Sequence, residues 1–312
     1  MKENSTFPLI SVLMSTYKES VDYIEKSVES ILNQTYRNLE FIIVIDDPLN
    51  YALINRITKY NDERIKLIIN DRNIGLVSSL NKGLQYCKGD YIARMDADDI
   101  SHIDRLEKEY NFLIKNDLDL VGTYFRLFSD NNEKNEVYQF PISNEACIRK
   151  LKYANCLQHP TWLAKSKVFF ALEGYRNIET CEDYDFVFRA IFKGFKIGNC
   201  PEILLDYRFN LNSISRKNEA KQRIIAKFLE KKYRQKKSCS LNEYNMFIKS
   251  KKYYCLMNKE LRIQNLKYNF HHSKSKKKKF IYLIQLLFSF TFIKIVLTKK
   301  FNRFIGMIRK YQ

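Results

Sequence analysis

The chain has 312 residues, of which 45% are hydrophobic and 29% charged, with eight glycines and five prolines. This composition provides enough apolar residues for a sizeable core and excludes a disordered or fibrous chain. The seven cysteines form no CxxC pair, which argues against a disulfide framework or a cysteine-based zinc module and fits a reducing cytoplasm. At roughly 150 residues per domain, the length predicts one large or two ordinary domains.

The excess positive charge lies in the last third of the chain. The formal net charge is +19, and residues 216–312 carry 27 Lys and Arg against 4 Asp and Glu, whereas residues 1–215 carry 27 against 31. A strongly basic region indicates an anionic partner, either nucleic acid or the anionic cytoplasmic face of a membrane. We therefore expect a domain over 1–215 and a basic helical region over 216–312.

A lysine-rich run over 274–279 precedes an apolar stretch over 280–297. Eighteen residues are at the lower edge of the length of a membrane-spanning helix, and basic residues flank both ends. The pattern favours an amphipathic segment near 274–303 that lies on the membrane surface, with a buried core helix and a true span as alternatives. Because the N-terminus lacks the pattern of a signal peptide, we expect a cytoplasmic protein, peripheral on the cytoplasmic face of the inner or plasma membrane.

In chain order, short apolar runs alternate with helical patterns. We expect strands at 9–16, 39–46, 65–70 and 91–98, and helices at 21–34, 50–60 and 76–87. Such alternation predicts βαβ units and a parallel sheet, in which ligands bind beyond the carboxyl ends of the strands.

The pattern is more mixed after residue 100. We expect a helix over 101–116 with Ser101 as its N-cap and another over 181–194 with Gly194 at its C-terminal end. Strands are expected over 118–128, from 161 and as two segments, KIGNC and ILLDYRF, within 196–209, and basic helices from 216 onward.

Polar residues follow each of the four early strands. They are Thr16 and Tyr17, then Asp46 and Asp47, then Arg72, and finally Asp96, Asp98 and Asp99. No glycine-rich phosphate loop accompanies them, which argues against a Rossmann dehydrogenase or a P-loop NTPase.

The acidic run after the fourth strand is the strongest chemical signal. In an extended segment, Asp96 and Asp98 point to the same side. Two carboxylates at this spacing suit Mg²⁺ or Mn²⁺ bound to a diphosphate. The alternative is an acidic turn that caps the next helix through Asp98 or Asp99.

The other candidates each have a plain structural alternative. Asp46 or Asp47 could accept hydrogen bonds from a base or ribose, or simply start a turn before Pro48. Arg72 could pair with a diphosphate or remain a solvated turn arginine. The Glu182–Asp183 pair could deprotonate an alcohol or only complement a helix N-terminus.

The remaining candidates are His159, Trp162 and Tyr175. His159 is a metal ligand, an acceptor contact or a core histidine. Trp162 and Tyr175 form either a platform for a sugar or part of the core.

Several ordered motifs of residues 7–210 resemble family 2 glycosyltransferases. The motifs are ISVLMSTYKE, ESILNQTYRNLEFIIVIDDP, NIGLVSSLNKGLQYCKGDYIARMDADD, HPTWLAKSKV, GYR and CEDYDFVFR. The nearest subgroup is the bacterial enzymes that build capsule, exopolysaccharide or O-antigen repeat units. The resemblance implies an α/β GT-A fold with a Rossmann-like, mostly parallel central sheet flanked by helices. The usual DDGS turn is Asp46-Asp47-Pro48-Leu49 here, so the choice between Asp46 and Asp47 as the base-binding residue stays open.

The resemblance implies an inverting, metal-dependent hexosyl- or N-acetylhexosaminyltransferase. Its donor would be a nucleotide-sugar, for which the resemblance favours UDP over TDP or GDP, and its acceptor a hydroxyl of a polyprenyl-diphosphate-linked saccharide. The implied roles are nucleotide binding by Thr16, Tyr17, Asp46 or Asp47, and Arg72; binding of ribose, diphosphate and Mn²⁺ or Mg²⁺ by Asp96 and Asp98 with Asp99; and base catalysis by Asp183, paired with Glu182. The basic tail would hold the enzyme at its membrane-bound acceptor, with no role for nucleic acid.

Two other classes of function compete with this interpretation. A nucleotidyltransferase also uses paired carboxylates, but it would place a glycine-rich, basic loop after the first strand, where STYKES stands. A non-enzymatic protein that binds nucleic acid or membranes would use the basic third alone, and it leaves the acidic strand ends unexplained.

Overall fold

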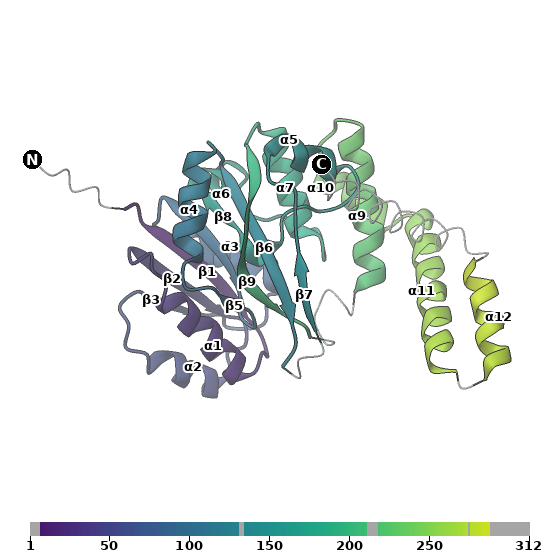
Figure 1. The fold of residues 1–312 in the computed structure, drawn as a ribbon, viewed down its shortest axis with the longest axis horizontal. Helices are drawn as coiled ribbons and strands as arrows, with labels where there is room; N and C mark the ends of the chain where they lie inside the picture. The colour runs from purple at the N-terminus through teal and green to yellow at the C-terminus, as the bar shows by residue number, and fades with distance from the viewer. Residues whose placement is uncertain (1–6, 131–133, 211–217, 274, 288–312) are drawn as a thin grey trace, which may run out of the picture. The chain divides into compact units, whose positions relative to one another are not determined.

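The computed structural model describes residues 7–130, 134–210, 218–273 and 275–287. The chain separates into two compact units. The first comprises Met1–Lys217 and Ile225–Leu241, and the second comprises Asn218–Ile224 and Asn242–Gln312. The first unit contains the sheet and its helices, and the second is helical in its described residues (Figure 1).

Nine strands in the described part of the first unit form one sheet in the order β3-β2-β1-β4-β8-β6-β9-β5, with β7 paired to β6. Their bounds are β1 Ile10–Thr16, β2 Leu39–Ile45, β3 Ile65–Ile69, β4 Tyr91–Asp96, β5 Ile100–Ser101, β6 Leu120–Phe128, β7 Asn135–Tyr138, β8 Leu163–Lys165 and β9 Ile197–Arg208. The strands β3, β2, β1 and β4 are mutually parallel, and β8 is the antiparallel strand that joins β4 to β6. The predicted parallel core of the sheet is confirmed.

Helices cover both faces of this sheet (Figure 1). They are α1 Val21–Leu32, α2 Tyr51–Thr58, α3 Leu76–Leu84, α4 Arg105–Lys115, α5 Asn144–Leu151, α6 Ser166–Ala171 and α7 Glu182–Phe192, with a short 3-10 helix η1 at His159–Thr161. Side chains of β1 alternate between the faces, so that Val12 joins the core formed with α1. Leu13 faces α3, where a side chain at Gly83 would clash with it. Close approach of α3 to the sheet therefore requires glycine at this position.

Four local expectations differ from the structure. The strand expected over 91–98 ends at Asp96, and Ala97 and Asp98 form a turn. Ser101 is not an N-cap, because it belongs to β5 and pairs there with Leu205 of β9. The helix α4 begins four residues later, at Arg105. The extended segment expected from 161 is only the three-residue β8 before α6, and 196–209 contains one continuous strand rather than two segments.

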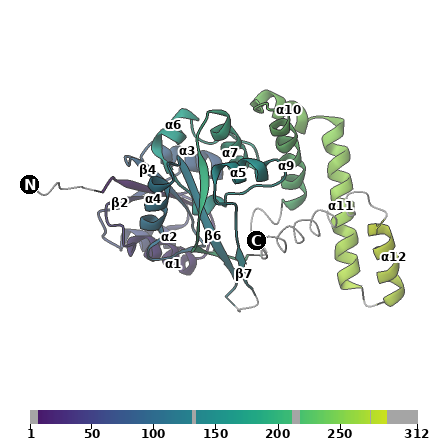
Figure 2. The same ribbon diagram turned by 45° about the horizontal axis from the view of Figure 1, so that its top comes forward.

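The basic region forms helices, as expected for its described residues. These are α9 Glu219–Arg234, α10 Leu241–Ile248, α11 Lys251–His272 and α12 Lys276–Leu287. Within the first unit, the second half of α9 packs on α7, with the Tyr233 and Phe188 rings 4.6 Å apart. Within the second unit, α11 and α12 lie side by side as a helical hairpin, clearest after the rotation in Figure 2.

Candidate active site

The ends of four parallel strands meet at one edge of the sheet. Thr16 is aligned with Ile45 and Ser15 with Asp96, and Ile45 is aligned in turn with Ile69. The loops that follow these strands therefore carry the predicted site residues at a common edge. This is the edge where ligands bind in open α/β sheets.

The loop after β1 is organised by a residue that sequence reasoning missed. Glu19 accepts a hydrogen bond from the Thr16 hydroxyl at 2.7 Å and from the Tyr17 backbone N–H at 2.6 Å, both through Oε2. Thr16 is 1% exposed, whereas Tyr17 is 39% exposed. Between them and Glu19, Lys18 adopts a φ of 64°, which folds the carboxylate back onto the loop. The Tyr17 ring is thus partly exposed on a fixed backbone, with Lys18 Nζ 4.9 Å from its centroid.

Asp46 holds the loop after β3. It is 2% exposed and accepts hydrogen bonds from the backbone N–H groups of Ile74 and Gly75, each at 2.9 Å, and from Asn70 Nδ2 at 2.8 Å. The loop that Asp46 anchors in this way carries the exposed Arg72. Both carboxylate oxygens of Asp46 therefore accept hydrogen bonds from donors within the protein.

Asp47 is the more accessible member of the pair. Its side chain is partly buried, and Oδ1 accepts the Leu49 backbone N–H at 3.3 Å in the turn that replaces DDGS. The two adjacent aspartates thus have different environments.

The acidic run after β4 is crowded and partly desolvated. Asp96 Oδ1 accepts a hydrogen bond from Arg94 Nη2 at 2.5 Å. Burial raises the pKa of Asp98 to about 7, with further contributions from the nearby charges of Asp96 and Glu19. The arrangement is a turn rather than an extended strand, but Asp96 lies close enough to Asp98 for its charge to raise the pKa of Asp98.

Asp99 is buried and tied to the last strand of the sheet. Its Oδ1 accepts the backbone N–H of Arg208 at 2.8 Å, and its Oδ2 has no hydrogen-bond partner among the described residues. Burial, followed by the charges of Asp96 and Asp98, raises the pKa of Asp99 well above its usual range. Arg208 also donates from Nε to the Asp98 carbonyl at 2.7 Å, so it fixes the backbone of the acidic turn.

No group of three or more His, Cys, Asp or Glu in the described ranges is arranged as a metal site. Asp96 is paired with Arg94, and Asp99 is turned toward Arg208. The donor set nevertheless fits a divalent cation. The buried Oδ2 of Asp99, which has no hydrogen-bond partner among the described residues, is a hard oxygen donor of the kind that Mg²⁺ and Mn²⁺ prefer.

The Glu182–Asp183 pair lies in the first turn of α7. Asp183 accepts a hydrogen bond from Asn155 Nδ2 to Oδ2 at 3.0 Å and from the Tyr184 backbone N–H to Oδ1 at 2.7 Å. Burial raises the pKa of Glu182 to about 7 and that of Asp183 to about 6, and the charge of Asp96 contributes to both. The pair therefore lies close enough to Asp96 of the acidic run for their charges to interact, a proximity that the sequence alone did not establish.

The remaining candidates, His159, Trp162 and Tyr175, contact one another. His159 Nε2 and the Tyr175 hydroxyl form a hydrogen bond of 2.8 Å, and the His159 ring lies 4.6 Å from the Trp162 ring. Burial, together with the charge of Arg94, lowers the pKa of His159 well below its usual range. All three rings are buried. Of the alternatives left open for them, a hydrogen-bonded core histidine and core packing of Trp162 and Tyr175 agree with these contacts.

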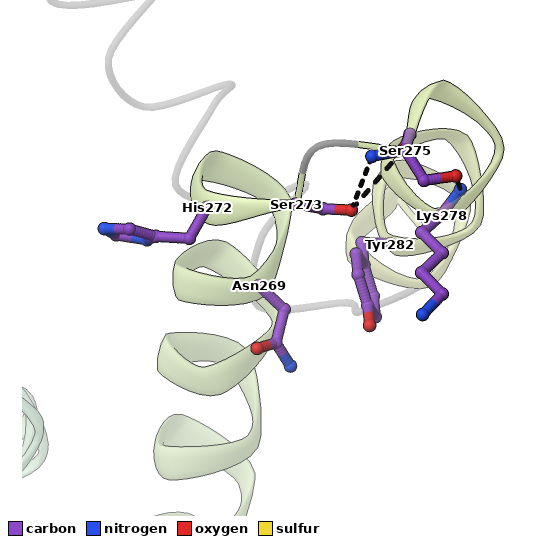
Figure 3. A pocket seen from close by; sticks show the side chains of 6 residues that line it. All are labelled: Asn269, His272, Ser273, Ser275, Lys278 and Tyr282. Atoms are coloured by element: carbon purple, nitrogen blue, oxygen red, sulfur yellow. Dashed lines mark hydrogen bonds between the residues drawn. The ribbon is translucent and has the colours of Figure 1, made fainter.

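The helical hairpin of the second unit contains a separate open hollow of about 410 Å³ (Figure 3). It is lined by Asn269, His272, Ser273, Ser275, Lys278 and Tyr282. Across the described residues, no helix is both long and apolar enough to cross a bilayer. Residues 288–303 of the predicted membrane segment lie outside the described residues.

Comparison with known proteins identifies the family to which the chain belongs. Residues 11–170 match the sequence profile of the family described as "Glycosyl transferase family 2". The O-antigen biosynthesis glycosyltransferase WbnJ of Escherichia coli is 35% identical over 209 residues, which cover 66% of this chain and 81% of that protein. A second relative, the UDP-Gal:alpha-D-GlcNAc-diphosphoundecaprenol beta-1,3-galactosyltransferase of Escherichia coli, is 28% identical over 70% of this chain and 80% of its own length.

A similar solved structure is the mannosyltransferase PcManGT from Pyrobaculum calidifontis in complex with GDP-Man and Mn²⁺. It has a TM-score of 0.58 at 15% identity and covers 90% of this chain and 80% of its own. This likeness establishes the GT-A fold. The extent of the profile match and the 35% identity to WbnJ establish the family as well. This chain is a glycosyltransferase that belongs to glycosyl transferase family 2.

Proposed function

We propose that this enzyme transfers a sugar from a nucleotide-sugar to a hydroxyl of a lipid-linked saccharide in the biosynthesis of a bacterial surface polysaccharide, with inversion at the anomeric carbon. The observation that carries the proposal is the proximity of Asp96 to both Asp98 and Asp183, because the charge of Asp96 raises the pKa of each. A donor-binding acidic run and a partly buried base are thereby brought to one place. Neither a nucleotidyltransferase nor a binding protein accounts for that second carboxylate pair.

The loops at the sheet edge form the nucleotide site in this proposal. The exposed ring of Tyr17 provides a stacking surface for the base, and the Glu19 carboxylate fixes its backbone. Asp47, with an accessible carboxylate, accepts the base N–H, while Asp46 sets the loop that carries Arg72. Arg72 pairs with the diphosphate.

Asp96 and Asp98 would hold Mn²⁺ or Mg²⁺. Asp99 would support them, because its carboxylate is held by the backbone N–H of Arg208 on β9. When bound, the cation supplies Lewis-acid stabilisation of the negative charge on the leaving diphosphate. This chain's own contribution at that point is a preformed acidic turn whose backbone Arg208 holds.

Asp183 is the general base. The acceptor oxygen forms a bond to the anomeric carbon as its proton moves to Asp183, and the bond from that carbon to the diphosphate oxygen breaks with its electron pair on the nucleotide. A single displacement of this kind inverts the configuration and requires no enzyme nucleophile. Glu182, beside Asp183, adds a second carboxylate on the side where the acceptor would bind.

The relatives support the substrate classes. WbnJ is named for O-antigen biosynthesis, the galactosyltransferase is named for a UDP-sugar donor and a diphosphoundecaprenol-linked acceptor, and PcManGT was solved with a nucleotide-sugar and Mn²⁺. We extend these classes to this chain.

The decisive experiment combines donor hydrolysis with donor binding. Purified protein is incubated with UDP-, TDP- and GDP-sugars in Mn²⁺ or in EDTA, and nucleotide release and binding are both measured. We expect one nucleotide to bind and to be released slowly in Mn²⁺, with loss of both in EDTA and in Asp98→Asn. Glu63→Gln, at an exposed carboxylate of the same unit, is the matched control and should behave as the unchanged protein. Absence of nucleotide binding with Mn²⁺ present would overturn the proposal.

We further propose that residues 1–215 form the catalytic domain and that the basic region 216–312 holds it on the cytoplasmic face of the membrane. On α12, Phe280 is 63% exposed and Ile281 is 44% exposed, next to the exposed lysines Lys277 and Lys278. Aromatic and basic side chains in this arrangement suit the interface of an anionic bilayer.

Vesicle flotation tests this attachment. We expect the protein to float with vesicles of phosphatidylcholine and phosphatidylglycerol and not with phosphatidylcholine alone. Changing both Phe280 and Ile281 to Ser should release it, whereas Leu261→Ser, at a residue of α11 that is 44% exposed, should not. Unchanged membrane recovery in cell fractions after removal of residues 271–312 would refute the attachment.

A further inference from the structure

We propose that Asn155 is a positioning residue that holds the carboxylate of Asp183 in the orientation needed for the transfer step. The inference rests on the proposed role of Asp183 as the general base. Asn155 lies between α5 and η1, outside every motif residue to which the sequence assigned chemistry. Its Nδ2 donates to Asp183 Oδ2 at 3.0 Å.

The direction of this hydrogen bond is fixed by the backbone around Asn155. Its Oδ1 accepts the backbone N–H groups of Cys156 at 2.8 Å and of Leu157 at 3.3 Å. A flipped amide would place its NH₂ group against these two donors and its oxygen against the carboxylate, so both contacts would be repulsive. Cys156 and Leu157 are themselves fully buried. The Asn155 amide therefore donates to Asp183 while its oxygen is held by the two backbone N–H groups.

The second oxygen of Asp183 is held from its own helix. Oδ1 accepts the Tyr184 backbone N–H at 2.7 Å, and the Tyr184 hydroxyl donates to the Leu151 carbonyl at 2.9 Å. Leu151 ends α5, the helix before Asn155. The carboxylate is thus held at both oxygens, which restricts its rotation and leaves further acceptor positions free for a substrate hydroxyl.

The hydrogen bond also opposes the acidity of the surroundings. The charge of Asp96 on β4 raises the pKa of Asp183, and the charge of Asp183 in turn raises the pKa values of Glu182 and Cys181 beside it and of Tyr175 from the loop before α7. Burial and the charge of Asp96 raise the pKa of Asp183 to about 6, whereas the donor from Asn155 lowers it. Asn155 therefore helps to keep the base ionised near neutral pH.

The test compares Asn155→Ala and Asn155→Asp in the full chain. Asn155→Asp keeps the shape and the two backbone contacts but replaces the donor by an acceptor. Asn81→Ala is the matched control, because the Asn81 amide bonds the backbone N–H and carbonyl of Tyr175, each at 2.8 Å, in a similar two-sided clamp. The pKa of Asp183 is read by ¹³C NMR of carboxyl-labelled aspartate, with Asp183→Asn identifying its resonance. The kcat and KM of donor hydrolysis are then measured against pH.

We expect the pKa of Asp183 to rise by about one unit in Asn155→Ala and further in Asn155→Asp, because the loss of one hydrogen bond to a charged group corresponds to roughly that shift. The acidic limb of kcat should move upward with it. Even at pH 8, where Asp183 is ionised in Asn155→Ala, kcat should stay about ten- to a hundred-fold low, with the donor KM within about two-fold, because the carboxylate is misoriented. Asn81→Ala should move neither the limb nor the pKa of Asp183.

An unchanged pKa of Asp183 in both variants would overturn the proposal, as would an equal shift in Asn81→Ala. If neither variant folds, as judged by circular dichroism, Asn155 is an element of the fold and the proposal also fails. A shifted pKa in a protein that releases no nucleotide from any donor would instead leave the hydrogen bond standing and count against the proposed function. The two failures are therefore distinguishable.

Discussion

Arg94 donates from Nη2 to Asp96 Oδ1 at 2.5 Å, from a guanidinium that is buried beneath a partly exposed carboxylate. The charge of Arg94 also acts on Glu182 and Asp99. The buried Arg94 guanidinium thus interacts with the acidic run after β4 and with Glu182 of α7. It offsets part of the repulsion among carboxylates that the site brings together.

Replacing Arg94 by methionine should destabilise the fold strongly. The change leaves Asp96 and its acidic neighbours without their buried partner, and loss of one member of a buried pair typically costs about 3–5 kcal/mol. Arg56→Met removes an arginine from a more exposed pair with Glu25 and should cost only about 0–1 kcal/mol. Urea unfolding of both variants at neutral pH checks the difference. Equal losses would show that Arg94 is not a structural counter-ion.

Asp46→Asn and Asp47→Asn should have different effects despite their adjacency. Asp46→Asn turns an NH₂ group toward backbone donors and should cost about 1–3 kcal/mol, with weaker nucleotide binding because the Arg72 loop loosens. Asp47→Asn should weaken nucleotide binding without a measurable change in melting temperature. Calorimetric titration with the nucleotide and thermal melting separate the two. The opposite pattern would make Asp46 the base-binding residue.

Glu109 should make the stability of the fold depend on pH. It is fully buried at 3.6 Å from Arg105, and burial raises its pKa from 4.5 to about 8. Since the unfolded chain loses this proton near pH 4.5, the fold loses stability between that pH and about 8 and no more above it. Glu109→Gln removes this dependence. Its melting temperature relative to the unchanged protein should therefore rise as the pH increases from 5 to 8, and that of Glu107→Gln, at an exposed residue of the same helix, should not.

Glu19→Ala should weaken nucleotide binding by about ten-fold. The Tyr17 backbone and the Thr16 hydroxyl lose their common acceptor, and each such hydrogen bond to a charged group is worth about 1.5–3 kcal/mol at most. The global unfolding energy should change little, because the loop lies at the edge of the sheet. Nucleotide titration in Mn²⁺ checks the affinity, with Glu63→Ala as the exposed control. Tighter binding would mean that Glu19 acts mainly by repelling the acidic run.

The first half of the fold was predictable because its signals are local. The buried strands β1 and β2 are continuous apolar runs, and α1 has its apolar residues at helical spacing behind a serine cap. The later elements depend on distant partners. Ser101 is of a residue type that often caps helices, but it pairs with Leu205 of β9, which lies 104 residues later in the chain. The three-residue β8 is a strand only because β4 and β6 flank it.

The site shows the same division. The acidic run and the Glu182–Asp183 pair are visible as motifs, and four strand ends predict that their loops converge. The supports are less visible, because Glu19, Arg94 and Asn155 act through contacts that depend on loop geometry. The position of Glu19, separated from STY by one residue in the first loop, was the one local signal for it. Nothing in the sequence distinguishes the anchored Asp46 from the accessible Asp47.

The contacts of Arg208 with Asp98 and Asp99 also bear on the order in which this protein becomes competent. The acidic turn belongs to the first hundred residues, yet the groups that hold its backbone arrive on β9, about 110 positions later. The chain must lose the conformational entropy of closing that loop before these hydrogen bonds can form. A ribosome-bound chain can therefore assemble β1 to β4 early, but its donor site stays unfinished until the last strand of the sheet has emerged and docked.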